Sequence, residues 1–336
     1  MDTALLRQLG TIDQIAGIRE SVLLRGRSAG TRIAEFYNAA GLRFTVVPDC
    51  GMNLYDFSYR GVNFSFQSKN GLVAPQFFSP MDGEFVHQWS GGMLATCGLD
   101  NVGGHVQLDG AYPTHGRIGQ LPASTFGVRT WWEQEQYHLR AEGEMHQTCL
   151  YGRHLSLRRE ITTGLYERSL QICDTVTNLE AEEEPYMLLY HFNFGYPLVQ
   201  PGSRVAVSGA RWQGLNDRST DPEHLRAPED RCGEELFLHT GFGETGCAVV
   251  YNEELELGTY ISFETKNLPN LLQWKLMKSH DYVLAFEPCN TCGLDRAQAA
   301  AQDRLAKLPG YASIQNRLEL GVLDGLREIR GFIQQL

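Results

Sequence analysis

The chain has 336 residues, of which 42% are hydrophobic and 21% charged, as in an ordinary globular protein of one or two domains. Its net charge of −11, from 29 basic and 40 acidic residues, repels phosphate backbones and argues against a nucleic-acid partner. No stretch reaches the roughly 20 apolar residues of a membrane span, and the start lacks the apolar core of a secretory signal. We therefore expect a cytoplasmic protein without a membrane partner.

The first predicted element is an amphipathic helix over residues 3–16. Strand patterns follow at Thr31–Tyr37, Leu42–Val47 and Met52–Tyr59, bounded by turn residues such as Asn and Gly. Similar patterns recur as far as about residue 290 without crossover helices between them. This organisation indicates an all-β fold, a large antiparallel β-sandwich.

Two more helices are predicted towards the C-terminus, over residues 295–308 and 313–335. No linker divides the chain, so we expect a single domain over residues 1–336. In this interpretation, helical extensions at 1–25 and 295–336 flank a sandwich core of about 30–290.

Cys289 and Cys292 form a C-x-x-C pair in EPCNTCGLD. A zinc site would need a second pair or suitably spaced histidines, and a redox site would need a thioredoxin-like βαβ context. Because the sequence offers neither, we favour structural thiols and keep metal and redox roles as the alternatives.

The first candidate site is the glycine-rich segment 90–104, SGGMLATCGLDNVGG, followed by His115-Gly116-Arg117. The glycines let backbone approach a ligand closely. We take Asp100, His115 and Arg117 as candidate substrate-binding residues. A structured surface loop with a solvated arginine is the alternative.

The second candidate is YHFNFGYP, which starts at Tyr190. On strand periodicity, Tyr190, Phe192 and Phe194 share one face, whereas His191 and Asn193 share the other. A histidine on a strand is more often structural than functional. The neighbouring Asn, Gly and Pro make a functional role for His191 an equal alternative.

The third candidate is Glu287, which follows the apolar strand Val283–Phe286 and precedes a proline. Burial at such a position raises the pKa of a carboxyl group and suits a general base. The alternative is a partly exposed glutamate with Lys275 or Lys278 as its counter-ion.

The order of these segments resembles the galactose mutarotase-like (aldose 1-epimerase) superfamily, and within it the DUF4432 subgroup. The resemblance spans residues 20 to 330 and is carried by the motifs VPDCGM, TCGLDNVG, HGR, YHFNFGYP, QWK and FEPCN. It implies a sandwich of the mutarotase type with an open sugar cleft on a concave face. The motifs are more specific for the superfamily than for any one substrate.

The resemblance implies that His191 is the general acid and Glu287 the general base. His115 matches the histidine that contacts the sugar near its ring oxygen, and Arg117 is assigned to the arginine that binds hydroxyl groups. Tyr190 departs from the pattern, because characterised relatives have Asn before the central histidine. Their aspartate between the central histidine and the glutamate has no clear match here.

Mutarotation needs an acid and a base at the anomeric centre, and we expect no metal or cofactor. Asn193 and Lys275 would bind hydroxyl groups, while Trp89 or Trp274 would stack on the sugar. We therefore expect a carbohydrate 1-epimerase acting on a small-molecule sugar, and we consider a homodimer. The alternatives are a sugar isomerase or lyase acting on an acidic or keto sugar, and a non-catalytic carbohydrate-binding protein.

Overall fold

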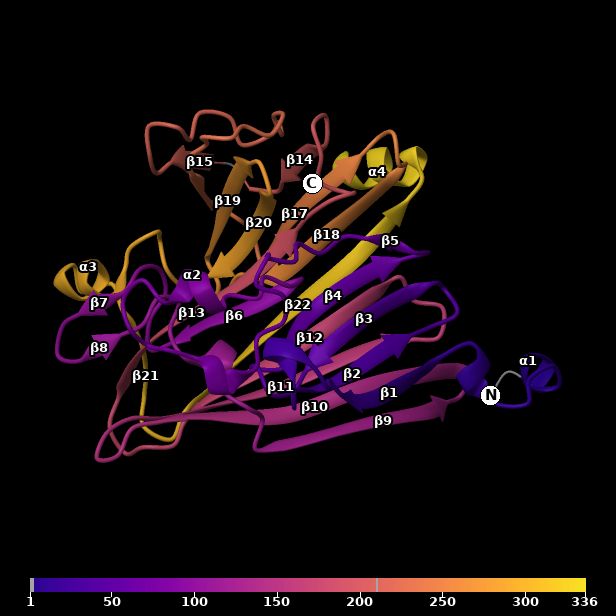
Figure 1. Ribbon diagram of the computed structural model, residues 1–336, viewed down its shortest axis with the longest axis horizontal. Helices are drawn as coiled ribbons and strands as arrows, with labels where there is room; N and C mark the ends of the chain where they lie inside the picture. The colour runs from indigo at the N-terminus through magenta and orange to yellow at the C-terminus, as the bar shows by residue number, and fades with distance from the viewer. Residues whose placement is uncertain (1–2, 210) are drawn as a thin grey trace.

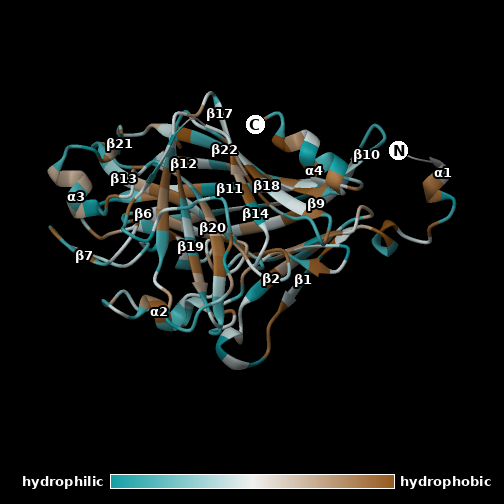
Figure 2. Cartoon of the chain, turned by 90° about the horizontal axis from the view of Figure 1, so that it is seen from above, coloured by the Kyte–Doolittle hydropathy of each residue, from teal (hydrophilic) through white to brown (hydrophobic). Residues whose placement is uncertain are grey.

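The computed structural model describes residues 3–209 and 211–336. Two large antiparallel sheets pack face to face (Figure 1). The largest hydrophobic cluster lies between them and includes residues from Ala16 to Val322. Seen from above, hydrophobic segments follow the strands of both sheets, and many connecting loops are hydrophilic (Figure 2). The predicted all-β sandwich is confirmed.

The larger sheet has twelve strands, ten of which form one continuous path. Their order is β1 (Gly17–Val22), β2 (Arg32–Tyr37), β3 (Leu42–Val47), β4 (Asn53–Tyr59), β6 (Leu94–Leu99), β13 (Glu184–Phe194), β20 (Asp281–Cys289), β19 (Asn270–Lys278), β16 (Glu235–Thr240) and β15 (Arg211–Gly214). The short strands β5 (Val62–Asn63) and β21 (Ala306–Leu308) pair with β4 and β13. This order makes the YHFNF part of YHFNFGYP, on β13, and FEPC, on β20, direct neighbours.

The smaller sheet has eight strands. Their order is β14 (Arg204–Val207), β17 (Thr245–Asn252), β18 (Leu257–Glu264), β22 (Ser313–Asp324), β12 (Ser169–Asn178), β11 (His154–Gly164), β10 (Gln136–Thr148) and β9 (Thr125–Glu133). A separate hairpin joins β7 (Val106–Gln107) and β8 (Ala111–Tyr112). The helices are α1 (Thr3–Leu6), α2 (Phe85–Gln88), α3 (Arg296–Ala301) and α4 (Leu326–Ile333), with 3₁₀ turns η1 (Ile12–Gln14), η2 (Gly26–Ser28), η3 (Pro75–Phe77) and η4 (Ile118–Gln120).

The helix predicted over residues 313–335 is wrong over most of its length. Residues 313–324 form β22, which lies inside the smaller sheet between β12 and β18. Alternation places Asn316, Leu318 and Leu320 in the interior. Pairing on both sides outweighs the local helical preference of a leucine- and glutamate-containing stretch. Only α4 is helical there.

The other two helix predictions are correct only in part. Residues 3–16 contain just the short α1 and η1, and the helix expected over 295–308 ends at Ala301. The segments interpreted as helical extensions also supply strands to both sheets, namely β1, β21 and β22. They are therefore part of the sandwich, not additions to it.

A buried ion pair on the smaller sheet is hydrogen-bonded to the larger sheet behind β13. Arg159 on β11 binds Asp174 on β12 through Nε–Oδ1 and Nη2–Oδ2 distances of 2.9 and 2.6 Å, and both side chains have no exposed surface. The Tyr190 hydroxyl, from the larger sheet, donates to Asp174 Oδ2 at 2.9 Å. Arg159 also donates to the carbonyl oxygens of Gly51 and Met52. All charges of this cluster are thus matched inside the core.

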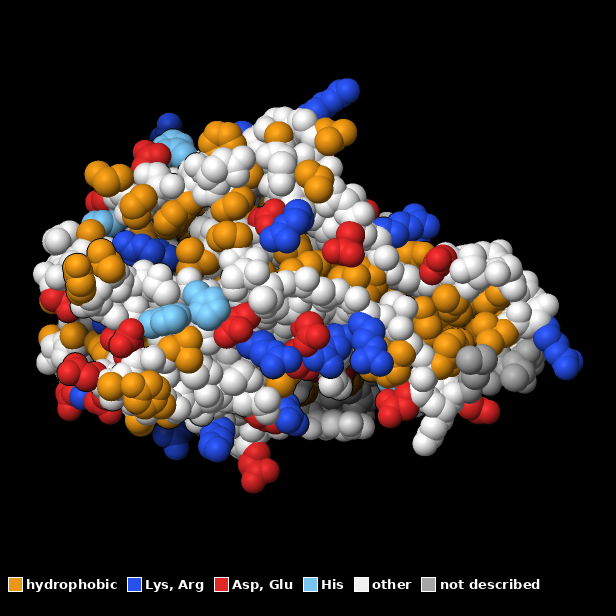
Figure 3. Space-filling view, turned by 90° about the horizontal axis from the view of Figure 1, so that it is seen from below, with side chains coloured by type: hydrophobic (Ala, Val, Ile, Leu, Met, Phe, Trp, Pro, Cys, Tyr) orange, Lys and Arg blue, Asp and Glu red, His pale blue; other side chains and the backbone are white. Residues whose placement is uncertain are grey.

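The outer face of β10 and β11 carries a band of alternating charges. Acidic and basic side chains interleave there, with histidines at one end (Figure 3). The band contains Arg140, Glu142, Arg158, Glu160, His146 and His154. Such exposed pairs contribute little to stability.

Among the described residues, no helix has the length and apolar character needed to cross a membrane.

Candidate functional site

The candidate site is built on the face of β13 that points away from the smaller sheet, here called the outer face. Tyr190, Phe192 and Phe194 point into the core, whereas His191 and Asn193 alternate to the outer face. On neighbouring β20, Glu287 has the same orientation as His191. Nε2 of His191 and Oε1 of Glu287 are 3.4 Å apart.

Burial changes the protonation of Glu287. Its side chain belongs to an outer-face region that also contains Cys97, Leu189 and Cys289, and the residue is only 4% exposed. Desolvation, followed by the charge of Glu234, raises the pKa of Glu287 from 4.5 to about 8. Near neutral pH, Glu287 therefore holds a proton.

The pKa of His191 shifts in the opposite direction. This residue is 6% exposed. Desolvation, with a smaller contribution from His115, lowers the pKa of His191 from 6.5 to about 3. The pair thus consists of a protonated carboxyl group and a neutral imidazole whose facing atoms lie 3.4 Å apart. A donor and an acceptor in contact can move a proton in either direction, as reversible acid–base chemistry requires.

Aromatic rings surround His191. The ring centroids of Trp89, Trp274 and His115 lie 5.6, 5.7 and 5.6 Å from its own. Trp274 comes from β19, and Trp89 directly follows the short helix α2. Phe85 of α2 stacks on Trp89 and also contacts His115. Rings of this kind exclude water and offer flat faces to a sugar.

The HGR segment brings His115 to His191 through a strained turn. His115 has φ 58°, and Gly116 has φ 71°. Desolvation lowers the pKa of His115 to about 4, so this imidazole is neutral as well. Arg117 instead turns away to pair with Asp100 and to donate to the carbonyl of Ala111.

Replacing Gly116 with Ala is expected to destabilise the protein and to displace His115. A Cβ at this position would lie 2.2 Å from the carbonyl oxygen of Gly98 and 2.6 Å from that of Asn101. The positive φ alone costs about 1–3 kcal/mol for a non-glycine residue. Urea unfolding measures the loss, with Gly104→Ala as control because its Cβ would meet nothing within 4 Å. Equal stability of the two variants would contradict this account.

Two other predicted substrate-binding residues have structural partners. Asn193 is fully buried, and its Nδ2 donates to the carbonyls of Gly92 and His191 at 2.9 Å. Lys275 follows Trp274 on β19 and therefore points to the opposite face, where its Nζ lies 2.9 Å from Glu235 Oε2. The structure thus brings His115 and Trp274 to His191 and Glu287, but it does not bring Lys275 there.

The sequence interpretation did not single out Phe85 or Cys97. Phe85 belongs to a turn-rich stretch without strand periodicity, so no pattern indicated that it would reach the HGR segment. Cys97 lies in the glycine-rich segment, and only the pairing of β6 with β13 brings it near Glu287. Cys289 and Cys292 are both free thiols. Within residues 3–209 and 211–336, no three His, Cys, Asp or Glu side chains gather as metal ligands would.

Comparison with known proteins adds a family and a fold. The family model described as "Domain of unknown function (DUF4432)" matches residues 28–322. The solved structure of a "putative aldose 1-epimerase" from Klebsiella pneumoniae is 25% identical, with a TM-score of 0.89 over 95% of this chain and 86% of that one. No match was found among curated proteins.

Two more distant structures share the architecture. A galactose mutarotase-like protein from Clostridium acetobutylicum is 17% identical, with a TM-score of 0.63 over 93% of this chain and 99% of that one. A galactose 1-epimerase from Lactobacillus acidophilus is 12% identical, with a TM-score of 0.59 over 92% and 99%. At these identities the similarity concerns the fold alone, which is of the galactose mutarotase-like type.

Proposed function

Because the chain belongs to the DUF4432 family, we propose that it uses its mutarotase-like scaffold as a carbohydrate 1-epimerase, interconverting the α and β anomers of a sugar. The observation that carries the proposal is the buried contact between His191 and Glu287. The similarity to the Klebsiella protein supports the same reaction class. We also propose that residues 1–336 form one domain.

The chemistry follows from the protonated carboxyl group of Glu287 and the neutral imidazole of His191. Glu287, as the acid, protonates the ring oxygen while the C1–O5 bond breaks, and neutral His191 takes the proton of the anomeric hydroxyl. The product is the open-chain aldehyde, held beside a carboxylate and an imidazolium. After rotation about the C1–C2 bond, the two transfers reverse and the ring closes on the other face. This assignment exchanges the roles that the family resemblance implied, in keeping with the pKa directions of the two groups.

The substrate proposed is a neutral sugar. Unpaired Lys275 and Arg117 side chains would favour an acidic or keto sugar, but Lys275 is paired with Glu235 and Arg117 with Asp100. Trp89 and Trp274 are partly exposed and would stack on the apolar face of a sugar ring, and His115 would bind a hydroxyl group.

Polarimetry and saturation-transfer NMR on a panel of freshly dissolved aldoses test the activity. The purified protein should speed anomer equilibration of at least one of them. Binding without any change in anomer rates would instead support the non-catalytic carbohydrate-binding alternative.

The pH dependence of kcat/KM should report the protonation of Glu287. The rate constant should be level from about pH 5 to about pH 7 and fall as pH rises through about 8, where Glu287 loses its proton. Glu234→Gln removes a neighbouring negative charge and should move this decline to lower pH. Rates are corrected for spontaneous mutarotation at each pH. A maximum between the ordinary pKa values of the carboxyl and the imidazole would contradict the proposed protonation state.

A further inference from the structure

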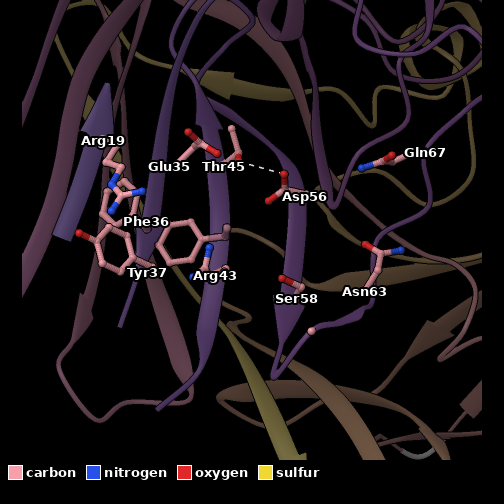
Figure 4. A pocket seen from close by; sticks show the side chains of 12 residues that line it. Arg19, Glu35, Phe36, Tyr37, Arg43, Thr45, Asp56, Ser58, Asn63 and Gln67 are labelled. Atoms are coloured by element: carbon pink, nitrogen blue, oxygen red, sulfur yellow. Dashed lines mark hydrogen bonds between the residues drawn. The ribbon is translucent and has the colours of Figure 1, made fainter. Parts of the chain in front are cut away.

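A polar groove of about 530 Å³ lies on strands β1–β4, beside the candidate site. Arg19, Tyr37 and Arg43 lie at one end of it, and Asn63 and Gln67 at the other (Figure 4). Glu35, Thr45, Asp56 and Ser58 line the part between.

The groove combines hydrogen-bond donors and acceptors without a net charge. Asp56 accepts a hydrogen bond of 2.9 Å from Thr45 Oγ1, and the register pairs Thr45 with Glu35 on the next strand. The two guanidinium groups lie over the ring of Tyr37, at 4.8 and 5.8 Å from its centroid. Two carboxylates and two guanidinium groups balance, so the groove suits a neutral ligand. Hydroxyl groups, which both donate and accept, match this mixture best.

The groove shares its sheet face with the catalytic pair. Thr45 points away from the core like His191, whereas Phe44 and Tyr190 point into it. The nearest strand of the groove, β4, is two steps from β13 in the strand order, which corresponds to about 10 Å across the sheet. Aromatic contacts lead from the end of the groove to the pair: the ring of Phe66 packs on Trp89 at 6.0 Å, and Trp89 packs on His191 at 5.6 Å. Gln67, at the end of the groove, directly follows Phe66.

We propose that this groove binds a further sugar unit, so that the substrate is an oligosaccharide whose reducing end lies at His191 and Glu287. This separation of two strands exceeds the width of one sugar ring, which is why a single sugar cannot occupy both places. The identification of the ligand as carbohydrate rests on the proposed function, whereas the binding site itself does not depend on catalysis.

A second groove allows a matched control. It has about 490 Å³ and lies on the smaller sheet, where Glu160, Glu264 and Glu319 contribute to its lining. It is equally polar but lies on the far side of the sandwich from His191. Binding that comes merely from a polar sheet surface would involve both grooves, whereas the proposed site involves only the first.

The test is calorimetric titration of the full chain with maltotriose, cellotriose and β-1,4-galactotriose, and with glucose and galactose. At least one trisaccharide should bind ten-fold or more tightly than its monosaccharide. Asp56→Asn combined with Glu35→Gln should abolish this advantage and leave monosaccharide mutarotation unchanged. Glu264→Gln, in the second groove, should change neither the preference for the trisaccharide nor monosaccharide mutarotation. Glu287→Gln should keep the trisaccharide affinity. Ser58→Ala with Gln67→Ala provides a second groove variant if the first fails to fold.

Equal affinity for all trisaccharides and their monosaccharides would overturn the proposal, as would groove variants that retain the full trisaccharide affinity. These results are distinct from a failure of the proposed function. A wild-type protein that binds a trisaccharide through the groove, yet leaves anomer rates unchanged, would exclude the epimerase and keep the binding site.

Discussion

Glu287→Gln is expected to lower kcat/KM for anomer interconversion by about 100- to 10,000-fold, the usual contribution of a general acid or base. Glutamine keeps the size of the side chain but cannot supply the proton that the ring oxygen needs. His191→Gln should cause a comparable loss, because it removes the acceptor of the pair. Rates of both variants are measured by polarimetry at about pH 7.

The same substitution should stabilise the protein in alkaline solution. Folding raises the pKa of Glu287 from 4.5 to about 8, so the folded state favours the carboxylic acid. Ionisation of buried Glu287 therefore destabilises the folded protein. This loss of stability is absent below the pKa of Glu287 in the unfolded chain, grows as pH rises and is complete above its pKa in the folded protein. At about pH 9 the free energy of unfolding of the variant should exceed that of the wild type by up to about 5 kcal/mol. At about pH 4 the two should be nearly equal.

Glu135→Gln is the control for both measurements, because Glu135 lies exposed in the β9–β10 hairpin. It should change neither the rate nor the pH dependence of stability. A Glu287→Gln protein that is inactive but no more stable than wild type at alkaline pH would mean that folding does not raise the pKa of Glu287. A fully active Glu287→Gln protein would exclude the proposed mechanism altogether.

The second large effect is expected at the buried ion pair of Arg159 and Asp174, and it concerns stability alone. Asp174→Asn and Arg159→Met should each lower the free energy of unfolding by about 3–5 kcal/mol, because each leaves the partner's charge buried and unpaired. Arg159 and Asp174 have no exposed surface, so water cannot compensate. Urea unfolding followed by circular dichroism measures both.

The double variant Arg159→Met with Asp174→Asn should lose much less than the sum of the single losses, since no uncompensated charge remains. Arg158→Met is the matched control, because Arg158 lies on the same strand but pairs with Glu142 on the surface. Its expected cost is below about 1 kcal/mol. Additive losses in the double variant would show that the two side chains do not act as a pair.

Strand periodicity was sufficient to predict the faces of β13. Aromatic residues at every second position predicted a buried face with Tyr190, and His191 followed on the other face. Alternation within one strand is a local property, and a sequence displays it directly. The same reasoning did not extend to Lys275, because its position depends on which face of β19 packs towards the core.

Contacts between distant segments could not be read from periodicity. His191 and Glu287 meet only because β13 and β20 are neighbours, and their meeting was expected from the family resemblance, not from either segment alone. Trp89 and Phe85 likewise reach the candidate site only because the irregular segment before β6 crosses the sheet there. For β22, the local pattern favoured a helix, and only pairing on both edges makes it a strand.

The central place of β22 has a consequence for synthesis of the protein. Its partners β12 and β18 leave the ribosome long before residues 313–324 do, so each presents an unpaired edge to the crowded interior of the cell in the meantime. Exposed edges of this kind invite pairing with other chains. The smaller sheet can close only after residues 313–324 have been translated, and a chain cut short before residue 313 would keep two open edges permanently.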